Sequence, residues 1–451
     1  MSKYQAYPEY KDSVVEWVGD IPVEWEMWKL SHAYREIGSG TTPPTTSDEW
    51  FGGDIPWVTT GELRETVING TKKNVSEKTI DTFSALRVYP AGSIAMAMYG
   101  ATIGRLGIFG VDATTNQACC VMTASDVIDN KYLFYWLWAF RQDIINLSSG
   151  GGQPNINQEK VASLKISAPI IDEQTQIANF LDHETAKIDT LIEKQQQLIK
   201  LLKEKRQAVI SHAVTKGLNP LAPMKDSGVE WLGEVPEHWG VSSLGYYASL
   251  NTGATPDRSN SSYWEGDVPW IKTGEVKYET IYKTEESISK LAVKQTSVQL
   301  SPPGTLLMAM YGQGVTRGRV AILGVHATYN QACVAITPNS HLFNEYLKVF
   351  FIAGYHAIRD GGNETSQMNL NADIVRKFKV TVPPINEQKE IVSFLEAELP
   401  RFDALLVNAD KAIKLMQERR TALISAAVTG KIDVRNWQAP ISQDQALEQT
   451  A

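Results

Sequence analysis

The chain has 451 residues, a mass of 50.0 kDa and a formal net charge of −8. Its 43% of hydrophobic and 21% of charged residues are ordinary for globular proteins and exclude a wholly disordered or collagen-like chain. Its three cysteines exclude a disulfide framework and a four-cysteine zinc site, and its longest aromatic-rich apolar run, Tyr132–Phe140, is too short to cross a bilayer.

The first residues contain no apolar signal core, and cysteines are few, so we expect a cytoplasmic protein in a reducing compartment. The acidic balance argues against a protein that binds DNA unaided, because such proteins usually present a basic surface. If the ligand is nucleic acid, we expect a partner protein to supply part of the attraction.

Residues 1–171 contain short apolar runs, such as Ile55–Val58 and Ser93–Met98, broken by Gly, Pro, Asn and Thr. This pattern predicts a strand-rich α+β domain. One helix is expected over Lys131–Leu147, ended by the glycines at 150–152.

Residues 172–219 are different. Of the eleven positions that alternate by four and three from Ile177 to His212, seven are apolar. That spacing is typical of a coiled-coil seam. We expect a short helix and then a long one that begins near Thr185. Glycine and proline at 217–223 end this segment.

The second half of the chain repeats the first with an offset of 212 to 214 residues. Matching segments include Asp12–Gly19 with Asp226–Gly233, Met96–Gly100 with Met308–Gly312, and Asn116–Cys119 with Asn330–Cys333. A period this long indicates a duplicated half and not a solenoid. The repeat predicts a second globular domain at 220–384, with a helix over Glu345–Arg359 ended by the glycines at 361–362. A second helical segment follows at 385–437, with its long helix beginning near Pro400, and a polar tail at 438–451.

The two helical segments have matched lengths and matched polar breaks, Glu184 with Glu398 and Lys205 with Arg419. We therefore predict that they pair antiparallel, with each glutamate near the basic residue of the other helix. The residues expected to form the pairing are Ile188, Leu191, Leu198, Leu202, Phe402, Leu405, Ala412 and Met416. The alternative is that each helix packs separately on its own domain. The predicted fold is α+β, with a two-fold internal repeat and two globular domains separated by a pair of long antiparallel coiled-coil helices.

No motif in the sequence predicts catalysis. The glycine-rich stretches lack the spacing of phosphate-binding loops, no methyltransferase motif is present, and the histidines show no metal-ligand spacing, so no catalytic or metal residue is assigned. One weaker alternative is a metal-dependent nuclease, since Pro256-Asp257 and Glu275-Val276-Lys277 fit its loose pattern. The first half lacks the carboxylate of Asp257, which favours a turn and an edge strand instead.

The remaining signal is a set of hydroxyl, amide and basic side chains on repeated loops, which suit contacts to base edges and phosphates. The candidate DNA-binding residues are Thr59, Thr60, Arg64, Lys72, Lys73, Tyr99, Arg105, Gln153, Asn155, Lys272, Thr273, Lys277, Tyr311, Arg317, Arg319, Gln367 and Asn369. The alternative is that the repeated Trp, Gly and Asn-Gln positions hold the shared fold. Residues that differ between the halves, such as Lys72 and Lys73, are the better candidates for sequence reading.

The repeated motifs resemble those of a known family, the specificity (S) subunit of Type I restriction–modification systems. The motifs that carry the resemblance are Val15–Pro22 with Trp25, Val229–Pro236 with Trp239, Tyr99–Arg105, Asn116-Gln117, Pro169–Gln174 and Pro383–Gln388. They cover nearly the whole chain, in the same order, twice. One departure is the segment Gly312–Gly318, where the second half has two extra residues before Arg319.

The resemblance implies a protein without catalysis of its own. Each globular domain is then a target recognition domain for one part of a split double-stranded DNA site. The helices form a spacer and a docking platform for two methyltransferase (modification) subunits. S-adenosylmethionine is expected on those subunits, and ATP and Mg²⁺ on separate restriction (translocase/nuclease) subunits, with no cofactor on this chain. The runner-up within recognition is a specificity subunit that serves another system, such as a fused nuclease–methylase. A coiled-coil assembly scaffold is the alternative of a different class.

Overall fold

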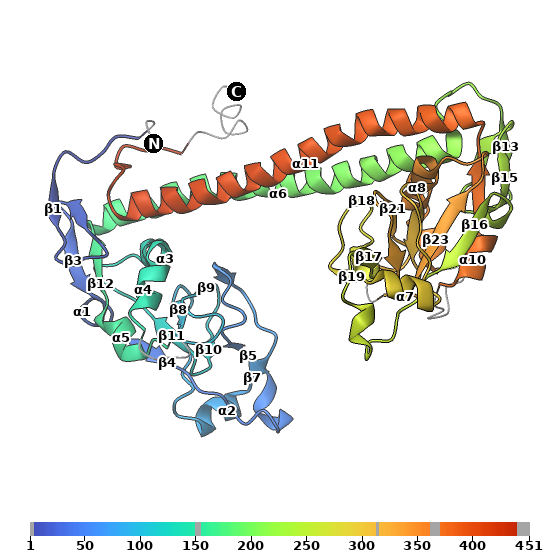
Figure 1. Cartoon of the computed structure of the whole chain (residues 1–451). Helices are drawn as coiled ribbons and strands as arrows, with labels where there is room; N and C mark the ends of the chain where they lie inside the picture. Colours follow the sequence, from blue (N-terminus) through green and yellow to red (C-terminus); the bar gives the residue numbers. More distant parts are fainter. Residues whose placement is uncertain (1–3, 149–154, 313–314, 361–369, 440–451) are drawn as a thin grey trace. The chain divides into compact units, whose positions relative to one another are not determined.

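The computed structural model describes residues 4–148, 155–312, 315–360 and 370–439. Two units combine distant parts of the sequence: unit 1 holds Met1–Gln195 with Lys411–Ala451, and unit 2 holds Gln196–Asp410. Each unit contains one globular domain and one part of each long helix, α6 (Ile171–Lys216) and α11 (Ile385–Val428) (Figure 1).

The domain of unit 1 is built on a five-stranded sheet, in the order β4-β11-β8-β9-β6, and a three-stranded sheet, β10-β5-β7. Its strands are β1 (Tyr10–Asp12), β2 (Asp20–Pro22), β3 (Glu26–Lys29), β4 (Ile37–Ser39), β5 (Phe51–Val58), β6 (Thr66–Ile68), β7 (Asn74–Val75), β8 (Ile94–Ala97), β9 (Leu106–Phe109), β10 (Thr114–Thr115), β11 (Cys119–Met122) and β12 (Lys165–Ala168). Its helices are α1 (Leu30–Ala33), η1 (Asp48–Trp50), α2 (Glu77–Thr82), α3 (Asn130–Ala139), α4 (Arg141–Asn146) and α5 (Gln158–Ser163).

The five-stranded sheet is buried on both faces. In β8, Ile94 and Met96 belong to one hydrophobic core, whereas Ala95 and Ala97 belong to another, because successive side chains of a strand point to opposite faces. The adjacent cysteines of β11 are divided between these two cores in the same way, and burial raises the pKa of both thiols.

The domain of unit 2 repeats this architecture, with sheets in the orders β16-β23-β20-β21-β18 and β19-β17-β22. Its strands are β13 (Met224–Asp226), β14 (Glu234–Pro236), β15 (Gly240–Ser243), β16 (Ala248–Thr252), β17 (Val268–Ile271), β18 (Thr280–Ile281), β19 (Glu286–Ile288), β20 (Leu306–Ala309), β21 (Val320–Leu323), β22 (Thr328–Tyr329), β23 (Cys333–Pro338) and β24 (Lys379–Val382). Its shorter helices are η2 (Leu244–Tyr246), η3 (Ser261–Tyr263), η4 (Thr273–Glu275), α7 (Lys290–Gln295), α8 (Asn344–Ala353), α9 (Tyr355–Asp360) and α10 (Ala372–Lys377).

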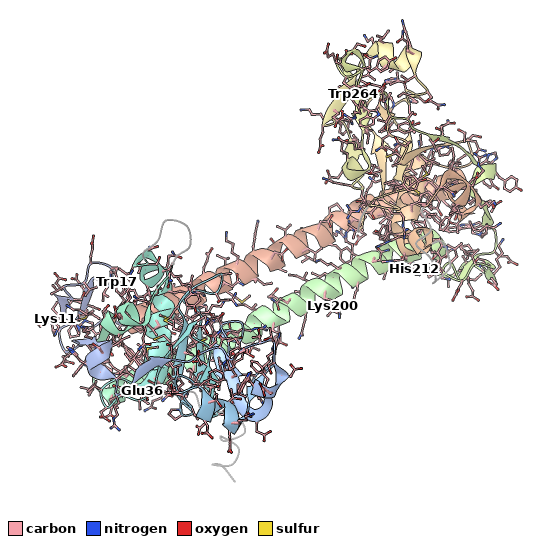
Figure 2. The ribbon with its side chains drawn as sticks, turned by 90° about the horizontal axis from the view of Figure 1, so that it is seen from below. Lys11, Trp17, Glu36, Lys200, His212 and Trp264 are labelled. Carbon is pink, nitrogen blue, oxygen red and sulfur yellow. The ribbon has the colours of Figure 1, made fainter. Side chains whose placement is uncertain are left out.

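The single helix predicted near the end of each domain is broken in both. α3 gives way to α4 at Phe140, which packs against Trp17 at a ring distance of 5.2 Å. In unit 2 the break falls at Gly354, where an added Cβ would lie 2.9 Å from the ring of Trp231. The repeated tryptophan (Trp17 is labelled in Figure 2) therefore packs against the break in each domain. The glycines expected to end these helices, at 150–152 and 361–362, lie outside the described residues.

Each long helix is continuous, contrary to the predicted split into a short and a long helix. α6 runs for 46 residues and α11 for 44, with Pro400 inside α11. A proline inside a helix leaves the carbonyl four residues before it without its usual donor. Pro400 and Glu396 are both exposed, so water can bond that carbonyl and the helix can continue. Among the described residues, no helix is both long and apolar enough to cross a membrane.

The cores of the two domains include the ends of the long helices, and the end of each helix packs on the domain of the other half. Ile424 and Val428, near the end of α11, belong to the main core of unit 1, and Ile210 and Val214 of α6 belong to that of unit 2. The structural units therefore cross the predicted boundaries, because residues 172–219 and 385–437 are each divided between them.

The two helices run antiparallel within each unit. In unit 1 the start of α6 lies beside the end of α11 (Figure 1), and Arg420 Nε lies 2.9 Å from Asp189 Oδ1. In unit 2 the corresponding ion pair joins Arg206 Nε to Asp403 Oδ1 at 3.0 Å. The glutamates predicted to lie near the basic residue of the other helix form ion pairs within their own helices. These ion pairs join Glu184 to Lys187 at 2.9 Å and Glu398 to Arg401 at 2.6 Å.

The phase of the helix seam also differs from the prediction. Of the residues expected to pair, Ile188 is buried, and Leu202, Phe402, Ala412 and Met416 are half-buried, whereas Leu191, Leu198 and Leu405 are 51%, 42% and 51% exposed. Their neighbours Ile192, Ile199 and Leu406 are half-buried in their place. The seam still repeats every four and three residues, but every second position is shifted by one.

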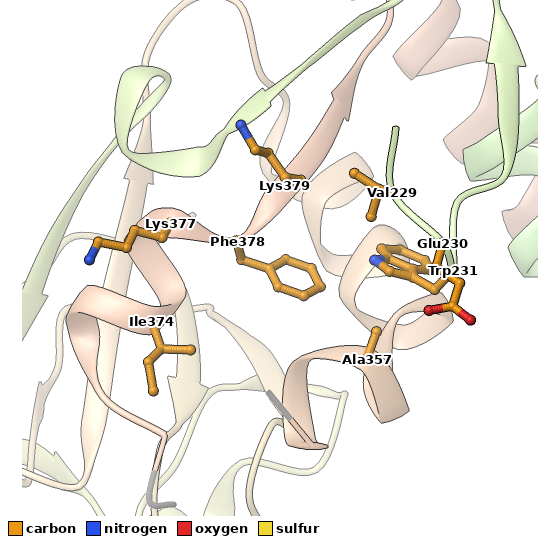
Figure 3. Close-up of a pocket in the computed structure, with 8 residues that line it drawn as sticks. All are labelled: Val229, Glu230, Trp231, Ala357, Ile374, Lys377, Phe378 and Lys379. Carbon is orange, nitrogen blue, oxygen red and sulfur yellow. The ribbon is translucent and has the colours of Figure 1, made fainter. Parts of the chain in front are cut away.

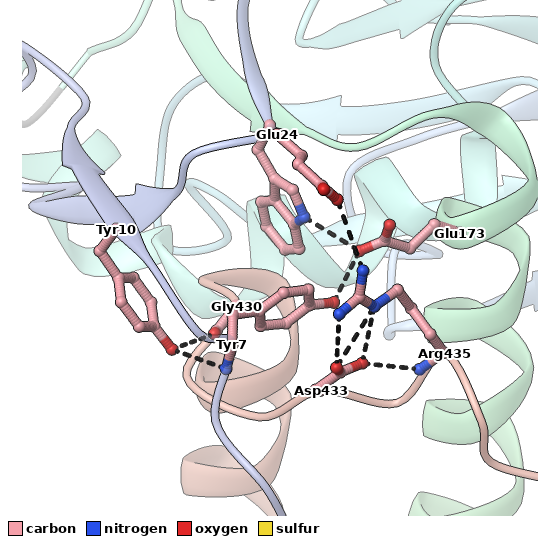
Figure 4. A network of polar contacts seen from close by, with 8 residues as sticks. Tyr7, Tyr10, Glu24, Glu173, Gly430, Asp433 and Arg435 are labelled. Carbon is pink, nitrogen blue, oxygen red and sulfur yellow. Dashed lines mark hydrogen bonds and ion pairs between the residues drawn. The ribbon is translucent and has the colours of Figure 1, made fainter.

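In unit 1, residues near the two ends of the described chain contact each other and the start of α6 in a polar network (Figure 4). Glu173, at the start of α6, accepts hydrogen bonds from Tyr7 Oη at 2.6 Å and from Trp25 Nε1 at 2.9 Å. The guanidinium of Arg435 lies over the Tyr7 ring and forms an ion pair of 2.8 Å with Asp433, which lowers the pKa of that carboxyl. Burial and the Glu173 carboxylate raise the pKa of Tyr7.

The repeated Glu-Gln motif has the same structural role in unit 2. Glu387 accepts a hydrogen bond from Trp239 Nε1 at 2.9 Å, as Glu173 does from Trp25. The neighbouring Gln388 is buried and donates to the carbonyls of His341 and Pro383, both at 2.8 Å. The motif therefore fastens the start of each long helix to its domain.

Candidate nucleic-acid interface

Four loops lie at one end of the sheets in unit 1. β8 ends beside the start of β11, where Ala97 pairs with Cys119, and β4 ends there as well. β5 and β10 are parallel and end together, with Val58 beside Thr115, and the loop after β10 leads into β11. The loops 40–42, 59–62, 98–105 and 116–118 therefore leave the sheets at the same end.

The repeated Trp, Gly and Asn positions of these loops support the fold. Trp57 Nε1 donates to the carbonyl of Thr41 at 3.1 Å, and the side chain of Asn116 accepts from Ala118 N at 3.1 Å. A Cβ added at Gly40 would lie only 1.7 Å from a backbone oxygen, so only glycine fits there. These interactions agree with the structural alternative considered for the repeated positions.

Several of the predicted DNA-binding residues of unit 1 lie together around an open hollow. It has a volume of about 250 Å³ and is lined by Trp57, Thr59, Gly61, Glu62, Lys72 and Lys73. Thr60 lies in the same turn, and Arg64 Nε donates to the carbonyl of Gly61 at 3.3 Å. The structure therefore brings a hydroxyl residue, Thr59, and two basic residues, Lys72 and Lys73, from two separate loops around one hollow. Lys73 Nζ lies 4.9 Å from the centre of the Phe51 ring.

Glu62 was not predicted as a site residue, although it lies between these groups. Its carboxylate accepts backbone hydrogen bonds from Thr59 in its own loop and from Lys72 in the other. The available signal was the repeated Trp-x-x-x-Gly-Glu segment, in which the glutamate is kept while the residues it holds differ.

The other candidates of unit 1 lie around the loop after β8. Tyr99 forms a β-bridge with Asn155, and Arg105 is half-buried directly before β9. Burial and the nearby Cys119 raise the pKa of Tyr99, while burial and Glu62 raise that of Cys119. The loops 59–62 and 98–105 therefore both border the start of β11. Gln153 lies outside the described residues.

The equivalent end of unit 2 carries the loops 253–255, 272–275 and 330–332, and the described residues 310–312 and 315–319 of a further loop. Lys272 and Thr273 lie where Thr59 and Thr60 lie in unit 1, and Lys277 is exposed beyond them. The loop between β20 and β21 carries Tyr311, Arg317 and Arg319. The guanidinium of Arg319 lies 5.7 Å from the centre of the Tyr278 ring. Gln367 and Asn369 lie outside the described residues.

The charge of this end differs between the units. Lys272 Nζ forms ion pairs with Glu286 at 2.8 Å and with Glu285 at 3.0 Å, and both carboxylates raise the pKa of the lysine. Arg258 also pairs with Glu286 and lies over the Trp264 ring. Unit 1 presents Lys72 where unit 2 has Glu285, so the two units offer different charge patterns on the same framework.

The residues of the nuclease alternative are engaged in local structure. Asp257 accepts hydrogen bonds from the backbone and hydroxyl of Ser259, which lower the pKa of its carboxyl. Glu275 accepts backbone hydrogen bonds from Lys272 and Glu285. Across the described ranges, no group of three or more His, Cys, Asp or Glu side chains could hold a metal ion.

A larger hollow lies elsewhere in unit 2 (Figure 3). It has a volume of about 700 Å³ and is lined by Val229, Glu230, Trp231, Ala357, Ile374, Lys377, Phe378 and Lys379. None of these residues belongs to the loops at the end of the sheets, and the lining is mainly apolar, with Trp231 and Phe378 stacked at 5.9 Å. It is therefore separate from the candidate interface.

Comparison with known proteins gives a consistent family assignment. The family described as the Type I restriction modification DNA specificity domain matches residues 22–201 and 236–406. The MjaIX specificity subunit of Methanocaldococcus jannaschii is 24% identical over 448 residues, covering 96% of this chain and 99% of that protein. The EcoR124I/EcoR124II specificity subunit of Escherichia coli is 27% identical over 190 residues, covering 41% of this chain and 45% of that protein.

Solved structures share the fold. A chain from a structure on complex assembly and conformational transition of the type I R-M system has a TM-score of 0.72 at 15% identity, covering 91% of this chain and 99% of its own length. The HsdS subunit from Thermoanaerobacter tengcongensis has a TM-score of 0.57 at 15% identity, covering 91% of this chain and 98% of its own length.

Proposed function

Because the chain belongs to the family of Type I restriction–modification DNA specificity subunits, we propose that each of its units reads one part of a two-part DNA site. The observation that supports this proposal is that equivalent loops lie at the same end of the sheets in both units. The framework is the same in both units, but Thr59 corresponds to Lys272 and Lys72 to Glu285. Two readers of different base sequences need a common scaffold and different DNA-facing residues.

We further propose that the chain has no catalytic site and directs two modification subunits to their target. Leu191 and Leu415 are 51% and 64% exposed on the helices of unit 1, and their repeat equivalents Leu405 and Leu201 are 51% and 60% exposed in unit 2. Exposed leucines at equivalent positions of the two units suit two copies of one partner. S-adenosylmethionine belongs on those modification subunits, and ATP and Mg²⁺ on restriction subunits.

The net charge of −8 fits a shared DNA-binding surface. Phosphate attraction dominates the affinity of DNA-binding proteins, so the isolated chain should bind DNA weakly and bind tightly only with its modification subunits. Sequence-selective binding at nanomolar concentration by the chain alone, at physiological salt, would contradict this view.

The direct test is to reconstitute the full chain with its modification subunits and map methylated adenines by sequencing. A two-part motif with an undefined spacer is expected. Lys72→Ala with Lys73→Ala should weaken binding to all sequences and lower the salt slope by about 1 for each lysine that binds a phosphate in the wild-type complex. Methylation without any sequence preference would contradict the proposal and favour the alternative of a coiled-coil assembly scaffold. Mg²⁺-dependent cleavage of plasmid by the chain alone would support the nuclease alternative.

A further inference from the structure

A single carboxylate joins the two loops that line the hollow of unit 1. Glu62 Oε2 accepts hydrogen bonds from Thr59 N at 2.7 Å and from Thr59 Oγ1 at 3.0 Å. Its other oxygen, Oε1, accepts from Lys72 N at 2.9 Å. The carboxylate therefore fixes the backbone of both loops at the positions that carry candidate DNA-binding side chains.

Unit 2 contains the same arrangement with different residues attached. Glu275 Oε2 accepts from Lys272 N at 2.8 Å, and Oε1 accepts from Glu285 N at 2.9 Å. In both units, backbone N–H groups of two loops donate to the two carboxylate oxygens, and in unit 1 the Thr59 hydroxyl adds one more bond. We call this arrangement a carboxylate clamp. Its backbone bonds do not depend on which side chains the loops carry. A clamp of this kind can stay the same while the residues that face a ligand change.

The position of the clamp explains why an acidic side chain is present on a surface proposed to approach phosphates. Glu62 and Glu275 are half-buried, and each carboxylate uses both oxygens to accept hydrogen bonds. Hydrogen bonds to a charged acceptor are shorter and stronger than bonds between neutral groups. The negative charge is therefore directed at backbone N–H groups.

On the basis of the DNA-reading function proposed above, we propose that Glu62 and Glu275 are positioning residues for sequence recognition. Each holds two loops of its own unit in fixed relative placement, so that their side chains meet the bases and phosphates of one half-site together. Base recognition depends on placement within a fraction of an ångström. Loosening one clamp therefore reduces discrimination at the half-site read by that unit and leaves the other unchanged.

The test uses Glu62→Gln and Glu275→Gln in the full chain, reconstituted with its modification subunits. Glutamine keeps one acceptor oxygen but presents an NH₂ group to one of the backbone N–H donors, which breaks one arm of the clamp. Methylation rates are measured on DNA duplexes that carry the wild-type site or single base changes in either half. For Glu62→Gln we expect the preference for correct bases in one half-site to fall about tenfold. Glu275→Gln should affect the other half-site by a similar factor.

Controls separate positioning from a general loss of stability. Glu77→Gln, at an exposed position of α2, makes the same chemical change outside both loops and should leave both preferences unchanged. A purely structural role of the clamp would slow methylation of all duplexes equally and leave the preferences intact. That outcome, or equal relaxation of both half-sites by either variant, would overturn the inference. If the wild-type complex modified no two-part site, the proposed function would fail, and this inference with it.

Discussion

The two ion pairs between α6 and α11 are equivalent in the repeat, and their surroundings predict different strengths. The repeat offset here is 214 residues, so Asp189 corresponds to Asp403 and Arg206 to Arg420. The pair Asp189–Arg420 in unit 1 is therefore equivalent to Asp403–Arg206 in unit 2. The pairs have similar lengths, 2.9 and 3.0 Å. Replacing each arginine by alanine therefore compares one interaction in two environments.

Arg420 is the more deeply engaged of the two arginines. Its side chain is 18% exposed and its guanidinium lies 4.2 Å from the centre of the Trp138 ring, whereas Arg206 is 31% exposed and Ile352 occupies the position equivalent to Trp138. A partly exposed ion pair contributes about 0.5 kcal/mol, and a cation–π interaction about 1 kcal/mol more. With the loss of packing along the arginine stem, Arg420→Ala should destabilise unit 1 by about 2 kcal/mol and Arg206→Ala unit 2 by about 1 kcal/mol.

The assay is hydrogen exchange of the core strands of each unit, measured with thermal unfolding of the full chain. For a unit of this size, 1 kcal/mol shifts the Tm by roughly 2–4 °C. Arg420→Ala should therefore lower the transition of unit 1 by about 4–8 °C, and Arg206→Ala that of unit 2 by about half as much.

A matched variant isolates the contribution of the ring. Trp138→Ile gives unit 1 the residue that unit 2 carries at the equivalent position, Ile352. In that background, Arg420→Ala should destabilise unit 1 no more than Arg206→Ala destabilises unit 2. Equal effects of the two arginine replacements in the wild-type background, or no coupling between Arg420 and Trp138 in a double-mutant cycle, would refute the reasoning.

Three further predictions address recognition and stability. Replacing residues 1–171 by the first domain of another family member should change one half-site of the methylated motif, and a change in both would contradict the assignment of one half-site to each domain. Val14→Gly should raise the unfolding free energy of unit 1 by about 1 kcal/mol in urea titration, because Val14 is 86% exposed at φ 59°, where its counterpart Gly228 has φ 68°; an unchanged or lower stability would contradict the presence of strain. Gly61→Ala and Gly274→Ala should leave the Tm unchanged, because a Cβ at either position meets no atom closer than 3.8 Å. Each should nevertheless reduce methylation about tenfold if DNA approaches the loop closely, and unchanged methylation would exclude such an approach.

Much of the architecture could be predicted from local patterns. The duplication, the strand-rich domains and the long helical segments all follow from repeated motifs and from apolar spacing. The antiparallel arrangement of the helices was also expected and agrees with the ion pairs in both units. The family followed from motifs that occur twice in the same order, and the comparisons confirm it.

Other features were decided by packing between distant segments. Adjacent apolar pairs, such as Leu191-Ile192 and Leu405-Leu406, allow two phases of the helix seam, and spacing alone cannot choose between them. The structure buries the second member of each pair more deeply. Similarly, a helical pattern continues through Phe140, but packing of Trp17 against that residue accompanies the break between α3 and α4.

The candidate site shows the same division. The sequence alone predicted these loops and several of the side chains that line the hollow, because hydroxyl and basic residues recur there in both halves. It could not identify Glu62 as the link between two loops, since the partner Lys72 lies ten residues away and donates through its backbone. Local sequence determines which elements form and which residues a loop carries. Only the tertiary structure decides which loops meet, because that depends on hydrogen bonds and burial between segments that are distant along the chain.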